Sequence, residues 1–431
     1  MQRVMYAVAV LVIVAWGLTV FGHNPVMDVW WWRKQLIYVT GLGSFVLMSL
    51  VMLLAVRPLW LEKHLQGLDK MYRLHKWAGI WAVALAVAHY LLKLSKTVLR
   101  EFVERGAKEP RIETFLEVFR GAAKDVGEWS VWLFGLLLLL TLWQRFPYHI
   151  WRYTHKTLSA LYLLMVFHSI VLAPAGWWLE PAGVLLALTA AVGVYAAIVA
   201  LAGRIGHNRR YPGTVLSIKQ HAGETLEVTC QLPKSWSHRP GQFAFITFDR
   251  FEGAHPFTVN SADLADGQVS FAIKALGDYT TRLQTELEVG RQVLVEGPYG
   301  YFDMDLDSKG QQVWVGAGIG ITPFIAWLEA LLEQPERAPT ATLFYCIENA
   351  EDAVFVEKLE RLAAVLPNIT LRVHYSDEQG FLSAEQALQG QSKQTQVWFC
   401  GPQGFADALQ TGMQALGCSA RNFHKEYFQM R

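Results

Sequence analysis

Four histidines lie in two long apolar stretches of the sequence. His75 and His89 are fourteen residues apart, and His155 and His168 are thirteen apart. A polar ring is costly inside hydrocarbon, although a single one could simply hydrogen-bond a neighbouring residue. Four rings at nearly equal depth on two helices favour a bound group instead. Imidazole is a common axial ligand of haem iron, and helix bundles hold cofactors between facing helices. We therefore predict two b-type haems.

The spacings arrange the four rings as two metal-ligating pairs. At about 1.5 Å per residue, each spacing separates two rings by about 20 Å along the helix axis. His75 is then expected to pair with His155 and His89 with His168, one haem near each membrane face. Fourteen residues return to within about 40° of the starting face, whereas thirteen leave an offset of about 140°. Either the second helix is locally over- or underwound, or its rings approach their haems from different azimuths.

A glycine-rich loop at residues 316–323 (GAGIGITP) marks the second half of the chain. It follows the apolar run QVWV and precedes an apolar helix, where glycines let backbone N–H groups approach a phosphate. Alone, such a loop is weak evidence, because a tight strand–helix turn looks similar. Here residues 296–300 (EGPYG) precede it and residues 399–404 (FCGPQG) follow it. The combination predicts a dinucleotide site.

The elements that must position the histidines are membrane helices. Hydrophobic residues make up 52% of the 431-residue chain, and 13 of its 17 tryptophans lie before residue 210. Several apolar runs reach the ~18 residues that span a bilayer core, and the tryptophans beside them are typical of the membrane interface. We predict six transmembrane helices, the first retained and not cleaved as a signal peptide. Their expected spans are about 4–21, 36–56, 74–94, 129–143, 156–173 and 179–203.

After the basic segment 204–210 the pattern becomes that of a soluble region. Short alternating strands bounded by Gly and Pro predict an antiparallel β-barrel, and the buried strands and helices beyond residue 311 predict an α/β domain with a parallel sheet. All four cysteines lie in this half without a C-x-x-C pair, so we expect it to be reduced and cytosolic. Six helices then place both termini in the cytosol. The expected domains are 1–205, 206–305 and 306–431.

Taken together, these features resemble the ferric reductase and NADPH oxidase family over nearly the whole chain. The resemblance rests on six helices with paired histidines, on HPFT at residues 255–258, GDYT at 277–280, the glycine-rich loop and CGP at 400–402. It implies a membrane di-haem domain, an FAD-binding β-barrel and an NAD(P)H-binding α/β domain.

The resemblance also implies a set of cofactor-binding residues. FAD is expected at His255, Pro256, Phe257, Thr258, Lys274, Gly277, Tyr279 and Thr280. The nicotinamide dinucleotide is expected at Gly316, Gly318, Gly320, Thr322, Pro323, Glu348, Cys400, Gly401 and Pro402. Two of the implied residues are candidate catalytic residues: Cys400 near the nicotinamide, and Phe428 on the flavin ring, with Tyr427 as the second choice.

Two positions depart from relatives that prefer NADPH. Such relatives often carry arginine where this chain has Glu348, and some carry another where it has Phe381. A carboxylate repels a 2′-phosphate but accepts hydrogen bonds from a free ribose diol. We therefore expect NADPH or NADH as donor, with a preference for NADH. The alternative is that Glu348 is a solvated loop charge.

The electron acceptor is expected beyond the opposite membrane face. In oxygen-reducing relatives a histidine one turn past the outer haem ligand, with a nearby arginine, helps form the oxygen site. Here Lys93 holds that position, and the end of the second span offers Arg33 and Lys34. These cations suit oxygen, giving superoxide, or an anionic ferric chelate. A periplasmic protein docking on the charged loop 95–128 is a third alternative, and the complete nucleotide motifs disfavour a non-catalytic haem protein.

FAD is needed between the nucleotide and the haems, because NAD(P)H delivers two electrons as a hydride while haem iron takes one at a time. The expected path runs from nicotinamide through FAD, the inner haem and the outer haem to the acceptor. A net charge of +1 without a basic stripe gives no indication of a nucleic-acid partner. We expect an integral protein of the bacterial inner membrane, constitutively active because the sequence has no calcium-loop signature.

Overall fold

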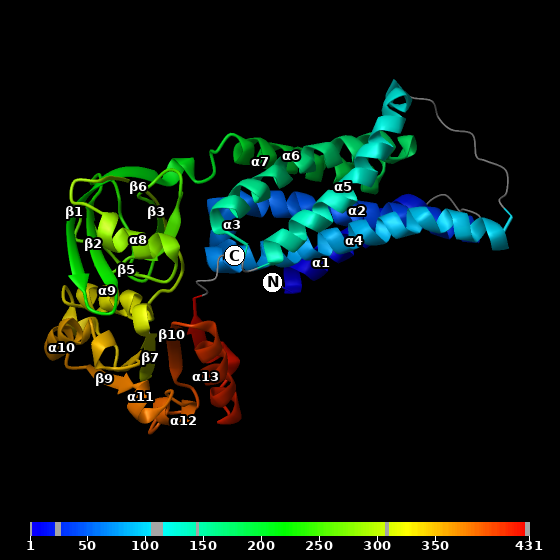
Figure 1. Ribbon diagram of the computed structural model, residues 1–431. Coiled ribbons are helices and arrows are strands. Elements are labelled where there is room, and N and C mark those ends of the chain that lie inside the picture. Colours follow the sequence, from blue (N-terminus) through cyan, green and yellow to red (C-terminus); the bar gives the residue numbers. More distant parts are fainter. Residues whose placement is uncertain (1, 22–26, 105–114, 144–145, 307–309, 427–431) are drawn as a thin grey trace. The chain divides into compact units, whose positions relative to one another are not determined.

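The computed structural model describes residues 2–21, 27–104, 115–143, 146–306 and 310–426. The chain divides into two compact units, one ending at Ile205 and the other beginning at Gly206. The described part of the first unit is helical, and the second unit contains two β-sheets (Figure 1).

Six helices of the first unit are long and apolar enough to span a membrane, counted over the described residues. They are α1 (Gln2–Phe21), α2 (Val29–Ala55), α4 (Leu68–Phe102), α5 (Arg120–Leu142), α6 (Tyr148–Leu172) and α7 (Pro181–Leu201). The predicted six-helix membrane bundle is thereby confirmed. α4 and α5 are longer than predicted, because their polar ends continue the helix beyond the apolar window. A short helix, α3 (Leu59–Leu65), connects α2 to α4.

Within the bundle, α2 packs against α1, α4 and α7, while α5 packs against α6. The Ser49 and Tyr162 hydroxyl oxygens lie 2.8 Å apart and join α2 to α6. Phe45 stacks on Tyr162 at a centroid distance of 5.7 Å. Gly193 of α7 makes room for this tyrosine, because a Cβ at that position would collide with its hydroxyl. Large apolar side chains such as Leu139 face outward, as expected for a surface in contact with lipid.

The second unit begins with a six-stranded antiparallel sheet in the order β4-β3-β6-β1-β2-β5. Its strands are β1 (Arg210–His221), β2 (Thr225–Gln231), β3 (Phe243–Thr247), β4 (His255–Thr258), β5 (Gln268–Lys274) and β6 (Gln292–Tyr299). An isolated bridge between Val259 and Phe271 brings the chain after β4 back to β5, so the two edges of the sheet approach each other. The helix α8 (Asp278–Glu286) follows β5.

A five-stranded parallel sheet follows, in the order β11-β10-β7-β8-β9. Its strands are β7 (Gln312–Ala317), β8 (Ala341–Ile347), β9 (Ile369–Tyr375), β10 (Gln396–Cys400) and β11 (Phe423–Lys425). β8 is buried along its whole length, as expected for a parallel strand covered on both faces.

The helices of this second sheet are α9 (Thr322–Leu331), α10 (Val356–Val365), α11 (Ser376–Gln379), α12 (Ala384–Ala387) and α13 (Gln403–Ala415). Trp314 of β7 and Phe324 and Trp327 of α9 are fully buried together in the core on the α9 side. The predicted order, an antiparallel flavin-type domain and then a parallel nucleotide-type domain, is therefore confirmed.

Candidate functional site

The four histidines meet as two pairs between α4 and α6. The rings of His75 and His155 have centroids 6.0 Å apart, and those of His89 and His168 are 6.3 Å apart. Two imidazoles that bind one metal ion from opposite sides through nitrogens at about 2.0 Å have centroids about 6 Å apart. The spacing of both pairs therefore fits a haem iron between the rings.

Each ring also uses its Nδ1 atom for a hydrogen bond. His75 pairs with the Val51 carbonyl at 3.1 Å, His89 with the Ile37 carbonyl at 2.9 Å, and His168 with the Ala123 carbonyl at 2.7 Å. A carbonyl only accepts, so Nδ1 carries the proton and Nε2 keeps its lone pair. Metal-ligating histidines are oriented in the same way by donating their other N–H.

His155 differs because its Nδ1 partner is a side chain. The Thr141 hydroxyl lies 3.4 Å away, and it donates its own proton to the Leu137 carbonyl at 2.7 Å. Thr141 can therefore accept a hydrogen bond from Nδ1–H. All four rings thus present Nε2 as the free nitrogen.

Two glycines allow neighbouring helices to approach the second pair. A Cβ on Gly41 of α2 would lie 2.9 Å from the Nδ1 atom of His89, and a Cβ on Gly127 of α5 would collide with the His168 ring. These contacts hold both imidazoles against backbone, which fixes their direction.

α6 is α-helical from Tyr148 to Leu172, so His155 and His168 lie on one continuous helix. The two pairs differ in their interplanar angles, 52° and 75°.

The cations near the second pair are engaged in structural contacts. Arg33 donates to the Ser95 hydroxyl at 3.1 Å and to the Lys93 carbonyl at 2.7 Å, and Lys93 forms a 2.9 Å ion pair with Glu128. Arg33 therefore ties the start of α2 to α4.

The residues expected at FAD gather on β4 and at the start of α8. His255 stacks on Tyr279 with centroids 4.4 Å apart, which joins the HPFT and GDYT motifs. Pro256 and Phe257 are partly buried, and Thr258 is buried. The Thr280 hydroxyl accepts from the backbone N–H groups of Leu276 and Gly277 at 2.9 and 3.1 Å, which fixes this turn.

Burial, with the nearby carboxylates of Asp249 and Glu252, raises the pKa of Tyr279 to about 12. The phenol is therefore neutral at physiological pH and can donate a hydrogen bond. Lys274 ends β5 and forms a 3.0 Å ion pair with Asp352, next to Thr225 and the glycine-rich loop.

The glycine-rich loop connects β7 to α9. Gly318 has a φ of +56° with open space around its Cα, and Thr322 donates to the Ile319 carbonyl at 3.1 Å. Pro323 lies in the first turn of α9, where its missing N–H costs nothing. Gly316 packs against Ile321, and Gly320 lies so close to the Cys400 carbonyl that a Cβ would collide with it.

Cys400 ends β10 directly beside Gly316 of β7. Its thiol is fully buried, and this burial, together with Glu426, raises its pKa well above the usual value. Cys400 is therefore a neutral thiol rather than a nucleophilic thiolate. Gly401 and Pro402 follow it, and Pro402 caps α13.

Glu348 and Phe381, the two positions that depart from relatives preferring NADPH, follow β8 and β9. Glu348 is exposed directly after β8, and its carbonyl accepts from the Asp377 backbone N–H at 3.0 Å. Phe381 is 81% exposed, 6.2 Å from the ring of Phe405. Tyr427 and Phe428 lie outside the described residues.

Three family models match successive parts of the chain: "Ferric reductase like transmembrane component" at residues 40–166, "FAD-binding domain" at 210–303 and "Oxidoreductase NAD-binding domain" at 314–411. The chain therefore combines a transmembrane domain similar to that of ferric reductases with an FAD-binding domain and an oxidoreductase NAD-binding domain. It therefore has the domain set of an NAD(P)H-dependent flavin oxidoreductase of the membrane.

Among curated relatives, respiratory burst oxidase homolog protein E of Arabidopsis thaliana is 29% identical over 219 residues, which is 44% of this chain and 22% of the relative. NADPH oxidase 5 of Homo sapiens is 23% identical over 337 residues, 65% of this chain and 41% of the relative. The chain thus matches less than half the length of both proteins. Among solved structures, the Amycolatopsis cytochrome P450 reductase GcoB matches with a TM-score of 0.45 and 21% identity, over 51% of this chain and 70% of that one.

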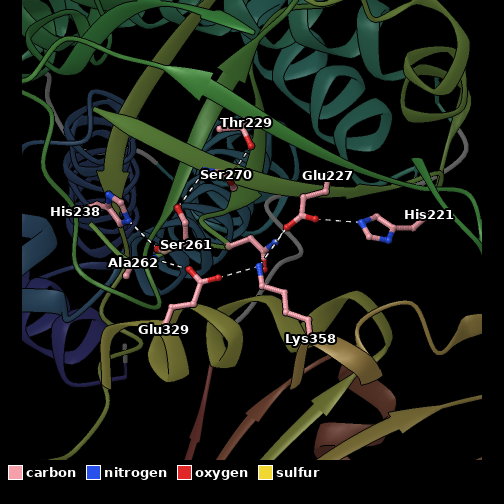
Figure 2. A network of polar contacts seen from close by, with 10 residues as sticks. His221, Glu227, Thr229, His238, Ser261, Ala262, Ser270, Glu329 and Lys358 are labelled. Carbon is pink, nitrogen blue, oxygen red and sulfur yellow. Dashed lines mark hydrogen bonds and ion pairs between the residues drawn. The ribbon is translucent and has the colours of Figure 1, made fainter. Parts of the chain in front are cut away.

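A network of ion pairs connects the two sheet domains of the second unit (Figure 2). Lys358 of α10 lies 3.3 Å from Glu227 of β2 and 2.9 Å from Glu329 of α9. Glu227 also contacts His221 at 3.1 Å and accepts from Asn260 at 2.9 Å. Burial acts to raise the pKa of Glu227, but Lys358 and His221 together hold it below the usual value.

Sequence reasoning missed this network. Glu227 and Lys358 are more than a hundred positions apart in the chain. In the sequence, each resembles an ordinary surface charge. Only the packing of α10 against the antiparallel sheet brings them together.

Proposed function

We propose that this protein transfers electrons from NAD(P)H, with a preference for NADH, through FAD and two haems b to an acceptor beyond the opposite membrane face. The proposal depends above all on one observation: two histidine pairs, 6.0 and 6.3 Å between ring centroids, whose Nδ1 atoms are all occupied. FAD, when bound, supplies the conversion of a two-electron donor to one-electron transfer.

Each cofactor has a set of residues that would hold it. His75 and His155 would bind one haem, and His89 and His168 the other. The stacked His255 and Tyr279 and the turn at Gly277 would hold FAD, because the neutral Tyr279 hydroxyl can donate to it and Thr280 fixes the turn.

The glycine-rich loop and the Cys400–Pro402 turn would receive the nicotinamide dinucleotide. Gly320 lets the loop close on the Cys400 carbonyl, so the two turns form one continuous backbone surface. The thiol of Cys400 is buried and neutral, so it adds no negative charge beside the nicotinamide that would repel the transferred hydride.

The order of the haems follows from the helix connections. α7 packs against α6 and is joined to it through η2 (Ala175–Leu179), so α7 ends where α6 begins, near His155. The chain then continues into the flavin-type domain. This connection supports our proposal that the His75–His155 haem is the inner one, with both termini on the cytosolic side of a bacterial inner membrane.

Oxygen is the proposed acceptor, giving superoxide. The two relatives are named as oxidases. Two histidine ligands on one iron would leave no open position for oxygen, so oxygen would accept the electron without binding to the iron. The ion pair of Lys93 with Glu128 reduces the positive charge available for an anionic ferric chelate.

An optical and oxygen-uptake experiment on the purified full-length protein tests this function. We expect about two haems b per FAD, reduced by NADH without oxygen, and then superoxide-dismutase-sensitive oxygen uptake without iron. Absence of a haem b spectrum would refute the electron path. Rapid ferric citrate reduction without oxygen uptake would refute only the acceptor.

A further inference from the structure

A cavity of about 210 Å³ lies among the starts of α2 and α7, the end of α1 and the η2 turn. Its walls include three aromatic side chains, Trp31, Tyr38 and Trp177, and the rings of Tyr38 and Trp177 meet edge to face at 5.1 Å. Cavities lined by aromatic side chains and a few polar groups are typical of small-molecule sites. The tryptophans also place it at the depth of a membrane interface, within reach of a lipid-soluble ligand.

Two hydrogen-bonding groups line this cavity without a protein partner in the described residues. Gln35 is 7% exposed, and its carbonyl accepts from Trp16 at 3.4 Å, but its amide N–H2 group meets no acceptor in that part of the chain. The Tyr38 hydroxyl likewise has no hydrogen bond there. The Tyr38 side chain is only partly buried, whereas a donor on a side chain as buried as Gln35 is normally satisfied. The cavity therefore fits a ligand that carries an acceptor oxygen.

The cavity is adjacent to the second histidine pair. Ile37, whose carbonyl accepts from His89 at 2.9 Å, directly precedes Tyr38. Gly41, which packs against the His89 ring, lies one turn further along α2. A ligand at Tyr38 is therefore separated from the His89 imidazole by a single turn of helix.

We propose that this cavity binds a quinone, which serves as a second electron acceptor besides oxygen. The inference rests on the proposed function, because that function supplies the electrons that reduce the quinone. The quinone ring would take two electrons, one at a time, that originate from NADH. Two protons from the outer aqueous phase, reached at the charged rim formed by Lys34 and Glu180, convert its two carbonyl groups to hydroxyl groups. Gln35 and Tyr38 donate to the carbonyl oxygens.

Binding is measured first, on the full-length protein in lipid nanodiscs, by quenching of tryptophan fluorescence with a short-chain ubiquinone. We expect saturable quenching, with Kd weakened about tenfold by Tyr38→Phe and again by Gln35→Leu, since each removes one hydrogen bond to the ligand. Tyr195→Phe, on the exposed face of α7, is the matched control and leaves Kd unchanged. Unsaturable quenching, or equal Kd values in all variants, overturns the proposal.

Electron transfer is measured second, as anaerobic NADH-dependent formation of quinol in the same nanodiscs. We expect quinol formation that Tyr38→Phe slows and Tyr195→Phe does not. Haem reduction and oxygen uptake without saturable quinone binding would overturn this proposal and leave the proposed function standing. Saturable binding lost in Tyr38→Phe, with haems that NADH does not reduce, would support the site and overturn the proposed function.

Discussion

At the scale of single residues, the histidines combine two properties that a metal ligand needs. Each imidazole faces a partner ring, and its Nδ1–H is occupied by an acceptor on another turn or helix. The acceptors Ile37 and Val51 are themselves fourteen residues apart on α2, so they repeat the spacing of His89 and His75 on α4. One helix therefore orients a ring of each pair.

Replacing His89 by leucine tests one haem site independently of the other. We expect the haem-to-FAD ratio to fall from about two to about one, because one pair loses a ligand and the other stays intact. NADH should still reduce FAD and one haem, while oxygen uptake is lost. The matched control is His64→Ala, which removes an exposed histidine bonded to the Trp60 carbonyl and should change neither value. Full haem content in the His89 variant would contradict the assignment.

Replacing Glu348 by arginine tests the nucleotide preference. The carboxylate is exposed directly after β8, beside Asp377 at the start of α11, so a 2′-phosphate would meet negative charge there. We expect the ratio of kcat/KM for NADPH to that for NADH to rise at least about tenfold, equivalent to about 1.4 kcal/mol. Glu360→Arg, on the exposed face of α10, is the control with the same charge change. An equal effect of both variants would show a general charge effect.

At the scale of elements, the sequence contained enough to predict the number of membrane helices and the type of each sheet. It did not contain enough to predict in which direction around its helix each histidine points. Apolar run length predicts α2 and α7 directly. The thirteen-residue spacing on α6 left two geometries open, because ring direction depends on how α5 and α6 pack and not on α6 alone. The collision that a Cβ on Gly127 would make with His168 is a contact between helices, which no local pattern reveals.

Gly127→Ala tests that contact. The added methyl group would push His168 away from the Ala123 carbonyl, and such overpacking costs about 1–3 kcal/mol. We expect the outer haem to be lost or to dissociate faster, measured as the haem-to-FAD ratio after gel filtration. Gly135→Ala, on the same helix with nothing within 4 Å, is the matched control and should retain both haems.

At the scale of the whole molecule, the chain arranges its sites in series along the sequence, from haem ligands to flavin turn to dinucleotide loop. Motif order made this arrangement predictable. The connection between the two sheet domains was not predictable, since Glu227, Glu329 and Lys358 carry no motif. Hydride transfer requires flavin and nicotinamide to face each other. We therefore expect the ion pairs that connect the two sheet domains to affect this step, as the motifs do.

Replacing Lys358 by methionine leaves two partly buried carboxylates, Glu227 and Glu329, without their shared cation. We expect the second unit to lose about 1–3 kcal/mol of stability, between the values for surface and buried pairs, and FAD reduction by NADH to slow several-fold. The matched control is Arg361→Met on the same helix, whose pair with Glu357 is solvent-exposed and should contribute little.

The effect of Lys358→Met on stability should depend on pH with a definite sign. The folded pKa of Glu227 lies below its unfolded value, so its stabilisation is complete above the unfolded pKa and is lost as pH falls through the folded one. The difference in unfolding temperature between wild type and Lys358→Met, followed by release of FAD fluorescence, should therefore be largest near pH 7. It should shrink below about pH 4.5. A difference that stays constant down to pH 3 would show that Lys358 stabilises the interface through packing alone.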